Sequence, residues 1–68
     1  MTIELNGQRI ELPDGAPVSE AISAAGANGE TRGVAVAVDG EVVPRGAWRR
    51  TPLREGQTVE VVGAIQGG

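Results

Sequence analysis

The sequence contains no histidine, cysteine, lysine, tyrosine or phenylalanine. Without histidine and cysteine, the chain has no soft metal ligand, no thiol nucleophile and no side chain that normally titrates near neutral pH. Its serines and threonines also lack a histidine or lysine base that would activate them. We therefore expect no metal site and no catalytic side chains, and an independent enzyme is disfavoured.

The chain also lacks the segments that direct a protein into or across a membrane. No apolar run approaches the length of a membrane span, and Met1-Thr2-Ile3-Glu4 is not the start of a signal peptide. The absence of cysteine argues against a secreted mini-protein held together by disulfides. We expect a cytoplasmic protein with no membrane partner.

Positive charge is scarce, since six arginines stand against nine acidic residues and leave a net charge of −3. Phosphate binding requires a basic surface, so nucleic acid is not expected as a partner. A modestly acidic surface suits docking onto a basic patch of another protein. A chain of 68 residues forms one small domain, which buries only about 60% of its unfolded surface and is too small to enclose a deep pocket. We expect a monomer when the protein is alone.

The first twelve residues predict a β-hairpin. Apolar and polar residues alternate over 2–5 and 8–12, and Asn6-Gly7 between them is the preferred dipeptide of a two-residue type I′ turn. The apolar members are expected to share one face: Ile3, Leu5, Ile10 and Leu12.

A short helix is predicted after the turn at Pro13-Asp14-Gly15, because the apolar spacing changes there from two to about three and a half residues. Pro17 suits the first turn of this helix, and Gly26 suits its end. The spacing predicts one apolar stripe: Val18, Ala21, Ile22 and Ala25.

Three further strands are predicted beyond the helix. Valines alternate with alanines over 33–38, and Asp39-Gly40 predicts a hairpin turn into a short strand at 41–43. Residues 45–52 are expected to be irregular. Renewed alternation over 57–62 predicts the last strand.

The order β-β-α-β-β-β predicts an α+β fold, with one helix on one face of a mixed sheet of about five strands. If the last strand lies beside the first at the centre of the sheet, its continuation leaves the sheet at one end. We therefore divide the chain into a domain over 1–62 and a flexible tail over 63–68.

The expected tail, Gly63-Ala64-Ile65-Gln66-Gly67-Gly68, carries no charged side chain. When extended, it reaches roughly 20 Å from the domain. Its glycines have no Cβ, so the backbone near the end fits a narrow channel. The Gly68 carboxylate is ionised at neutral pH and is a poor electrophile, so group transfer through it requires a partner enzyme to activate it, most simply as a mixed anhydride with AMP.

Several blocks of the sequence carry a resemblance to a known family. They are spread over the chain: Ile3-Glu4-Leu5-Asn6-Gly7, Leu12-Pro13-Asp14-Gly15, Val38-Asp39-Gly40-Glu41-Val42-Val43-Pro44-Arg45, Trp48, Thr51-Pro52-Leu53, Gly56-Gln57-Thr58-Val59-Glu60-Val61-Val62 and Gly67-Gly68. In these blocks, its size and its expected order of elements, the chain resembles the ubiquitin-like β-grasp sulfur carriers, most closely those of thiamine biosynthesis. Many members have serine or threonine where this chain has Pro17, so the usual side-chain cap of the helix is expected to be missing.

The resemblance implies a carrier that is not itself an enzyme. An E1-like activating enzyme would use ATP to adenylate the Gly68 carboxylate, and sulfur from a cysteine desulfurase would displace AMP and leave a thiocarboxylate. Thiazole synthase would then accept this sulfur while building the thiazole ring of thiamine. The residues expected to thread into the partner active site are Gly63, Ala64, Ile65, Gln66 and Gly67. No cofactor is expected on the carrier itself.

A docking surface for the activating enzyme and thiazole synthase is expected on the open face of the sheet. Four residues there are expected to form a shallow apolar patch, with Arg45 as a further contact: Ala35, Ala37, Val42 and Val62. On a monomer of this size such a patch often marks a protein contact.

Two other features each have two interpretations. The arginines at 45, 49, 50 and 54 form either a docking patch for an acidic partner or a solvated loop, and the solvated loop is slightly preferred. Trp48 is either a contact anchor for a partner or the closure of one edge of a small core, and the core role is preferred.

Two alternatives to thiamine sulfur transfer remain open. The same carrier chemistry would serve molybdopterin synthesis, sulfur transfer to an amino-acid precursor or tRNA thiolation. A β-grasp module that binds a partner without covalent chemistry is the alternative from another class, and for such a module Gly67-Gly68 would be an inert end.

Overall fold

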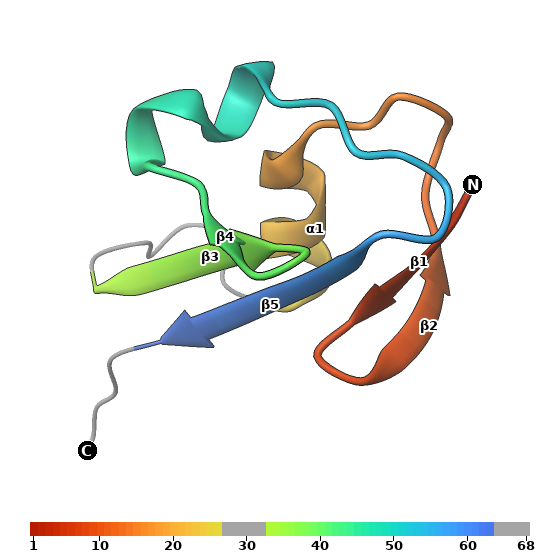
Figure 1. The fold of residues 1–68 in the computed structure, drawn as a ribbon, viewed down its shortest axis with the longest axis horizontal. Helices are drawn as coiled ribbons and strands as arrows, with labels where there is room; N and C mark the ends of the chain where they lie inside the picture. Colours follow the sequence, from red (N-terminus) through yellow and green to blue (C-terminus); the bar gives the residue numbers. More distant parts are fainter. Residues whose placement is uncertain (27–32, 64–68) are drawn as a thin grey trace.

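The computed structural model describes residues 1–26 and 33–63 (Figure 1). The elements follow the chain in this order: β1 (Thr2–Leu5), β2 (Gln8–Glu11), α1 (Val18–Ala24), β3 (Val34–Val38), β4 (Glu41–Val42), the 3₁₀ helix η1 (Arg45–Arg50) and β5 (Thr58–Gly63). The predicted order β-β-α-β-β-β is confirmed, with η1 inserted before the last strand. The predicted strand ends differ from the observed ones by at most one residue.

The five strands form one mixed sheet in the order β2-β1-β5-β3-β4 (Figure 1). Strands β1 and β5 run parallel at its centre, and the other three pairs are antiparallel. A parallel pair needs a long crossover connection, which here contains α1 and the second hairpin. The expectation that the last strand lies beside the first is therefore confirmed.

The two hairpin turns account for the register of the outer strands. Asn6 and Gly7 have φ angles of 50° and 85°, and Asp39 and Gly40 have φ angles of 50° and 84°. A type I′ turn needs positive φ at both central residues, and glycine, asparagine and aspartate tolerate that conformation best. Both predicted turns are confirmed, and each leaves only two residues between its paired strands.

Helix α1 buries only part of the stripe that the sequence predicts. The buried members are Val18, Ala21 and Ile22. Ala25 is exposed, so its predicted place in the stripe is wrong: it is the C-cap of a helix that ends there, before Gly26 with a φ of 84°. Pro17 is the N-cap and makes no side-chain hydrogen bond, as expected.

Helix η1 lies in the segment that the sequence analysis expects to be irregular, so that prediction is wrong. Its first turn is closed by the Ala47 N–H, which donates to Pro44 O at 2.8 Å. Trp48 is only 6% exposed, and its Nε1 donates to Val43 O at 2.9 Å. The core role preferred for Trp48 is confirmed. A helix this short shows no repeating pattern of apolar residues from which it could be predicted, and burial of the Trp48 indole stabilises it.

One hydrophobic core lies between the sheet and the two helices. Its members are Ile3, Leu5, Val18, Ala21, Ile22, Val36, Trp48, Leu53 and Val59. In Figure 1, α1 and η1 lie on the same side of the sheet. Among the described elements, the core therefore packs against one face of the sheet, and no helix covers the other face. No helix within 1–26 or 33–63 has the length and apolar character needed to cross a membrane.

Replacement of Leu53 by alanine tests this core. Leu53 is 1% exposed, so Leu53→Ala should lower the free energy of unfolding by about 2–5 kcal/mol. That is a large share of the roughly 3–10 kcal/mol expected for a domain of this length. Urea unfolding followed by Trp48 fluorescence measures the change. The control Val42→Ala, at a side chain that is 74% exposed, should stay within about 0.5 kcal/mol of the parent. Equal midpoints for the two variants would contradict this assignment of the core.

Candidate functional site

The C-terminal end of β5 is the feature from which the candidate site is built. Strand β5 runs through the centre of the sheet, and its pairing with β3 continues to its last residue, where Gly63 lies opposite Val34. The sequence analysis assigns Gly63 to the tail, but the structure extends the strand to it, because backbone pairing needs no side chain. The remaining predicted tail residues lie outside the described residues: Ala64, Ile65, Gln66, Gly67 and Gly68.

The apolar patch predicted on the sheet is brought together by strand register. Ala35 of β3 lies opposite Val62 of β5, and Ala37 lies opposite Val42 of β4. Neighbours at paired positions point to the same face. Val42 and Val62 are 74% and 62% exposed, the large hydrophobic side chains most open to solvent in the described chain. We call Ala35, Ala37, Val42 and Val62 the apolar patch.

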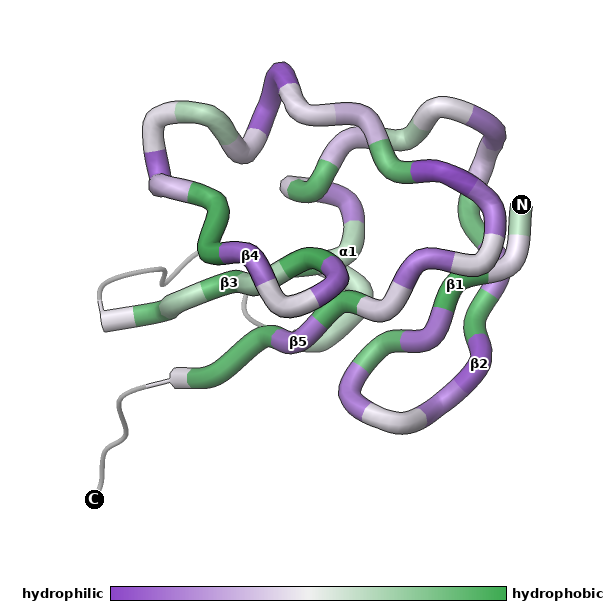
Figure 2. The backbone as a smooth tube through the Cα atoms, viewed as in Figure 1, coloured by the Kyte–Doolittle hydropathy of each residue, from purple (hydrophilic) through white to green (hydrophobic). Residues whose placement is uncertain are grey.

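The apolar patch lies beside the point where β5 ends. Figure 2 shows a hydrophobic stretch of β5 just before its C-terminal residue, alongside the hydrophobic β3. Val62 belongs to the patch and directly precedes Gly63, the last residue of β5. A protein that docked on the patch would therefore also meet the start of the C-terminal residues.

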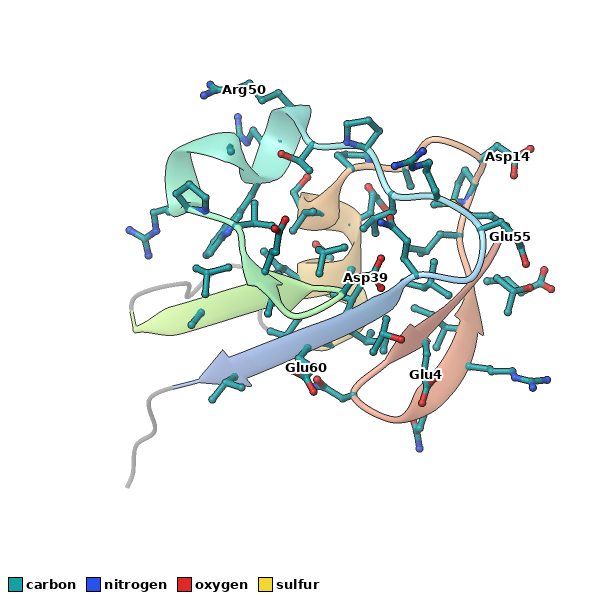
Figure 3. The ribbon with its side chains drawn as sticks, viewed as in Figure 1. Glu4, Asp14, Asp39, Arg50, Glu55 and Glu60 are labelled. Carbon is teal, nitrogen blue, oxygen red and sulfur yellow. The ribbon has the colours of Figure 1, made fainter. Side chains whose placement is uncertain are left out.

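The opposite half of the open face is polar and acidic. Glu60 lies opposite Ala37 on this face, and Glu4 lies beside Thr58 on the neighbouring strand. In Figure 3 the labelled side chains of Glu4 and Glu60 project on the same side of the sheet. The sequence analysis did not single out these two carboxylates, although strand alternation alone places them opposite the core. Arg9 of β2 lies opposite Glu4, so one positive charge also lies on this face beside its carboxylates.

Arg45 does not share the sheet with the four patch residues. It begins η1, where its guanidinium lies 5.7 Å from the centre of the Trp48 ring, within the range of a cation–π contact. The other three arginines of the cluster, at 49, 50 and 54, are exposed, and Figure 3 shows Arg50 pointing outward from η1. This agrees with the preferred interpretation of a solvated surface.

Side-chain chemistry of the kind that enzymes use is scarce in the described part of the molecule. Over 1–26 and 33–63, no group of three or more carboxylates is close enough to hold a metal ion. The Met1 amino group has its pKa raised above 8.0, chiefly by its hydrogen bond to Asp14. This amine also donates to Leu12 O at 2.8 Å, so it joins the residue before β1 to the residue after β2.

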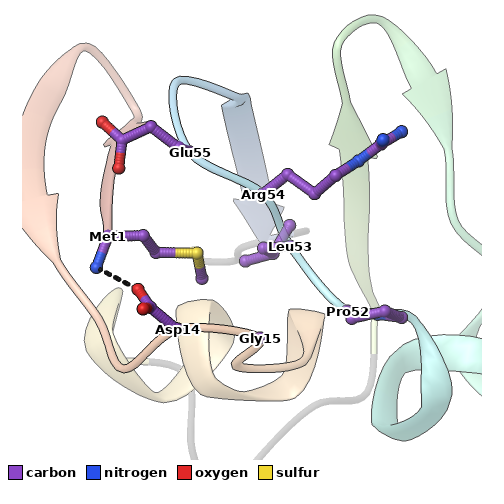
Figure 4. A pocket seen from close by; sticks show the side chains of 7 residues that line it. All are labelled: Met1, Asp14, Gly15, Pro52, Leu53, Arg54 and Glu55. Carbon is purple, nitrogen blue, oxygen red and sulfur yellow. Dashed lines mark hydrogen bonds and ion pairs between the residues drawn. The ribbon is translucent and has the colours of Figure 1, made fainter.

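A hollow lies beside Met1, away from the apolar patch. Figure 4 shows its lining, in which the amine of Met1 and the carboxylate of Asp14 form an ion pair of 3.0 Å. The remaining lining residues are Gly15, Pro52, Leu53, Arg54 and Glu55. Since the residues 52–55 precede β5, the hollow lies by the beginning of that strand, whereas the apolar patch lies by its end. The candidate site is therefore the end of β5 with the apolar patch.

Comparisons with known proteins extend over the whole chain. A sequence profile described as the ThiS family matches residues 2–68. The crystal structure of the thiamine biosynthesis protein (ThiS) from Geobacter metallireducens is 28% identical, with a TM-score of 0.77, and 100% of each chain is covered. The NMR solution structure of a thiamine biosynthesis protein from the same organism is 28% identical with a TM-score of 0.78, covering 100% of this chain and 88% of the other. A search of curated proteins found no match.

Proposed function

Because the chain belongs to the ThiS family, we propose that it is a sulfur carrier of thiamine biosynthesis whose C-terminal Gly68 holds the sulfur as a thiocarboxylate. The observation that carries this proposal is the family match over residues 2–68, which includes the terminal Gly67-Gly68. The fold supports it, since the central strand β5 leads directly into the C-terminal residues.

The proposed chemistry takes place at the C-terminal carboxylate. An E1-like enzyme would bind ATP, and the Gly68 carboxylate would attack the α-phosphate to form an acyl adenylate with release of pyrophosphate. Sulfur from the persulfide of a cysteine desulfurase, reduced to the sulfide level by a thiol reductant, would then form a C–S bond at the same carbon while the C–O bond to AMP breaks. Thiazole synthase would accept the sulfur and return the carboxylate. The carrier would bind no cofactor, because its partner uses the ATP.

The carrier itself would contribute presentation and docking. Its complete lack of histidine, cysteine and lysine leaves it without the usual catalytic nucleophiles and bases, so the partners would supply them. The apolar patch would meet the partner first, Arg45 of η1 would be a further contact, and Gly63 together with the residues after it would enter the active site. Small side chains favour such entry because they leave room in a narrow channel.

Deletion of Gly68 tests the proposed chemistry. The intact protein is incubated with ATP, an E1-like activating enzyme and a sulfur source, and its mass is measured. The full chain should gain the mass difference of one oxygen replaced by sulfur, whereas the deletion variant should gain nothing and keep its unfolding midpoint. Sulfur transfer to the deletion variant would overturn the carrier proposal.

The same preparation distinguishes the recipient of the sulfur. Addition of thiazole synthase and its other substrates should consume the thiocarboxylate and restore the original mass. A thiocarboxylate that forms and then resists thiazole synthase would leave the carrier chemistry intact and assign it to another pathway. Partner binding that is unchanged without Gly67 and Gly68, with no mass change in the full chain, would indicate a non-covalent binding module.

Substitution of the apolar patch tests docking. The double variant Val42→Ser, Val62→Ser removes two exposed apolar side chains, so its stability should change little while its affinity for the activating enzyme falls at least about tenfold. Calorimetric titration measures the affinity, and Ala25→Ser, at another exposed apolar position, is the matched control. Equal affinities for the double variant and the control would show that the partner docks elsewhere.

A further inference from the structure

The side chain of Asn6 continues the pairing of β1 with β5 after β1 has ended. Backbone pairing on this side reaches Asn6 itself, whose N–H donates to Val59 O at 2.9 Å. Beyond that point the primary amide takes over: Oδ1 accepts from the Val61 N–H at 2.8 Å, and Nδ2 donates to Val61 O at 3.2 Å. One side chain thus binds both polar backbone groups of one residue, as a further residue of β1 would.

The second hairpin holds the other end of β5 in a related way. The Asp39 N–H donates to Thr58 O at 2.7 Å, and its Oδ1 accepts from the Thr58 N–H at 2.9 Å. Its Oδ2 accepts from the side-chain amide of Gln57 at 3.1 Å. Two residues with positive φ, one in each hairpin turn, therefore bind the two ends of the central strand.

The residue type at each turn matches the groups that it faces. The turns alone require only positive φ, which glycine provides equally well. Asn6 faces one donor and one acceptor of Val61, and an amide supplies one of each. The carboxylate of Asp39 faces two donors, from Gln57 and Thr58, and an ionised carboxylate only accepts. The side-chain bonds are therefore a second role, additional to turn formation.

The two contacts differ in their distance from the functional end of the chain. Asp39 binds the first residue of β5, and Asn6 binds Val61, two residues before the strand ends at Gly63. From Val61 to Gly63, β3 pairs with β5 on one side. On the other side, the strand pairing with β1 stops at Val59, and among the described residues the Asn6 amide makes the last hydrogen bonds to β5.

We propose that Asn6 is a positioning residue for sulfur transfer, an inference that rests on the proposed carrier function. By keeping Val61 in the sheet, Asn6 fixes the position at which β5 ends at Gly63 and the residues leading to the reactive C-terminus begin. Val62 of the apolar patch lies between Val61 and Gly63, so docking and presentation share one rigid strand end. Release of this strand end would increase the number of residues between the sheet and Gly68 and lower the effective concentration of the Gly68 carboxylate at the partner active site.

The test compares Asn6→Gly with Asp39→Gly. Each variant converts a turn to Gly-Gly, which still favours the type I′ geometry, and each deletes the side-chain bonds to β5 at one end. Initial rates of adenylation are measured with the activating enzyme and ATP over a range of carrier concentrations. The temperature is kept well below the unfolding midpoints of both variants. Amide hydrogen exchange of Val61 and Gly63 is measured in the free proteins.

The expected result is a change in kcat confined to Asn6→Gly. Its kcat should fall about fivefold, the factor equivalent to one net hydrogen bond. Its KM should not change, because pairing with Ala35 of β3 keeps Val62 of the apolar patch in place. Its Val61 amide should exchange faster than in the parent, because it loses the Asn6 acceptor. Asp39→Gly should keep the parental kcat and KM, with parental exchange at Val61 and Gly63, although it loses a similar amount of stability.

Other outcomes would overturn the inference. A parental kcat in Asn6→Gly, or an equal fall in both variants, would show that Asn6 only stabilises the turn or the sheet. A rise in KM at constant kcat would make Asn6 a docking contact of the partner. If the parent chain itself is not adenylated, the carrier proposal fails and takes this inference with it, whereas a difference confined to the variants leaves the carrier proposal standing.

Discussion

Strand β5 pairs with β1 on one side and with β3 on the other, and its Val59 is fully buried at the middle of the core. These pairings join segments that are far apart in sequence, since Leu5 lies beside Val59. Without β5, the two hairpins would share no strand contact, and a two-stranded hairpin alone is at best marginally stable in water. The position of β5 also decides where the chain ends, because the last residues continue from the centre of the sheet.

A domain this small has one core and therefore two unequal sheet faces. Helices α1 and η1 cover one face, and the hydrophobic residues of that face are buried in the core, where they stabilise the fold. The other face carries alanines and two exposed valines beside the carboxylates of Glu4 and Glu60. Exposed valines add little to the stability of a monomer, and they are available for a partner. The small size also suits the proposed division of the chemistry, in which this chain would present a reactive group and a larger enzyme would supply catalysis.

Sequence patterns predicted most of the fold because its signals are local. Asn6-Gly7 and Asp39-Gly40 specify turns through their own φ preferences, and alternating valines specify strands. The apolar patch followed from the same alternation. Local signals were insufficient in two places. Burial of Ala25 depends on where α1 ends against the sheet, and formation of η1 depends on the fit of Trp48 into the core. The sequence alone indicated the functional role of the tail residues 64–68, which lie outside the described part of the structure.

The sequence by itself determined the element order, the two type I′ turns, the absence of histidine, cysteine and lysine, and the family resemblance, because each depends on residue type and near neighbours. Tertiary structure alone decided which residues from distant segments meet. It placed Glu4 beside Thr58, set Ala35 against Val62, and brought the Asn6 amide to Val61 across 55 positions of sequence. Asn6 in the sequence indicates only a turn, since the partner that gives its side chain a second role is supplied by the packing of β5 against β1.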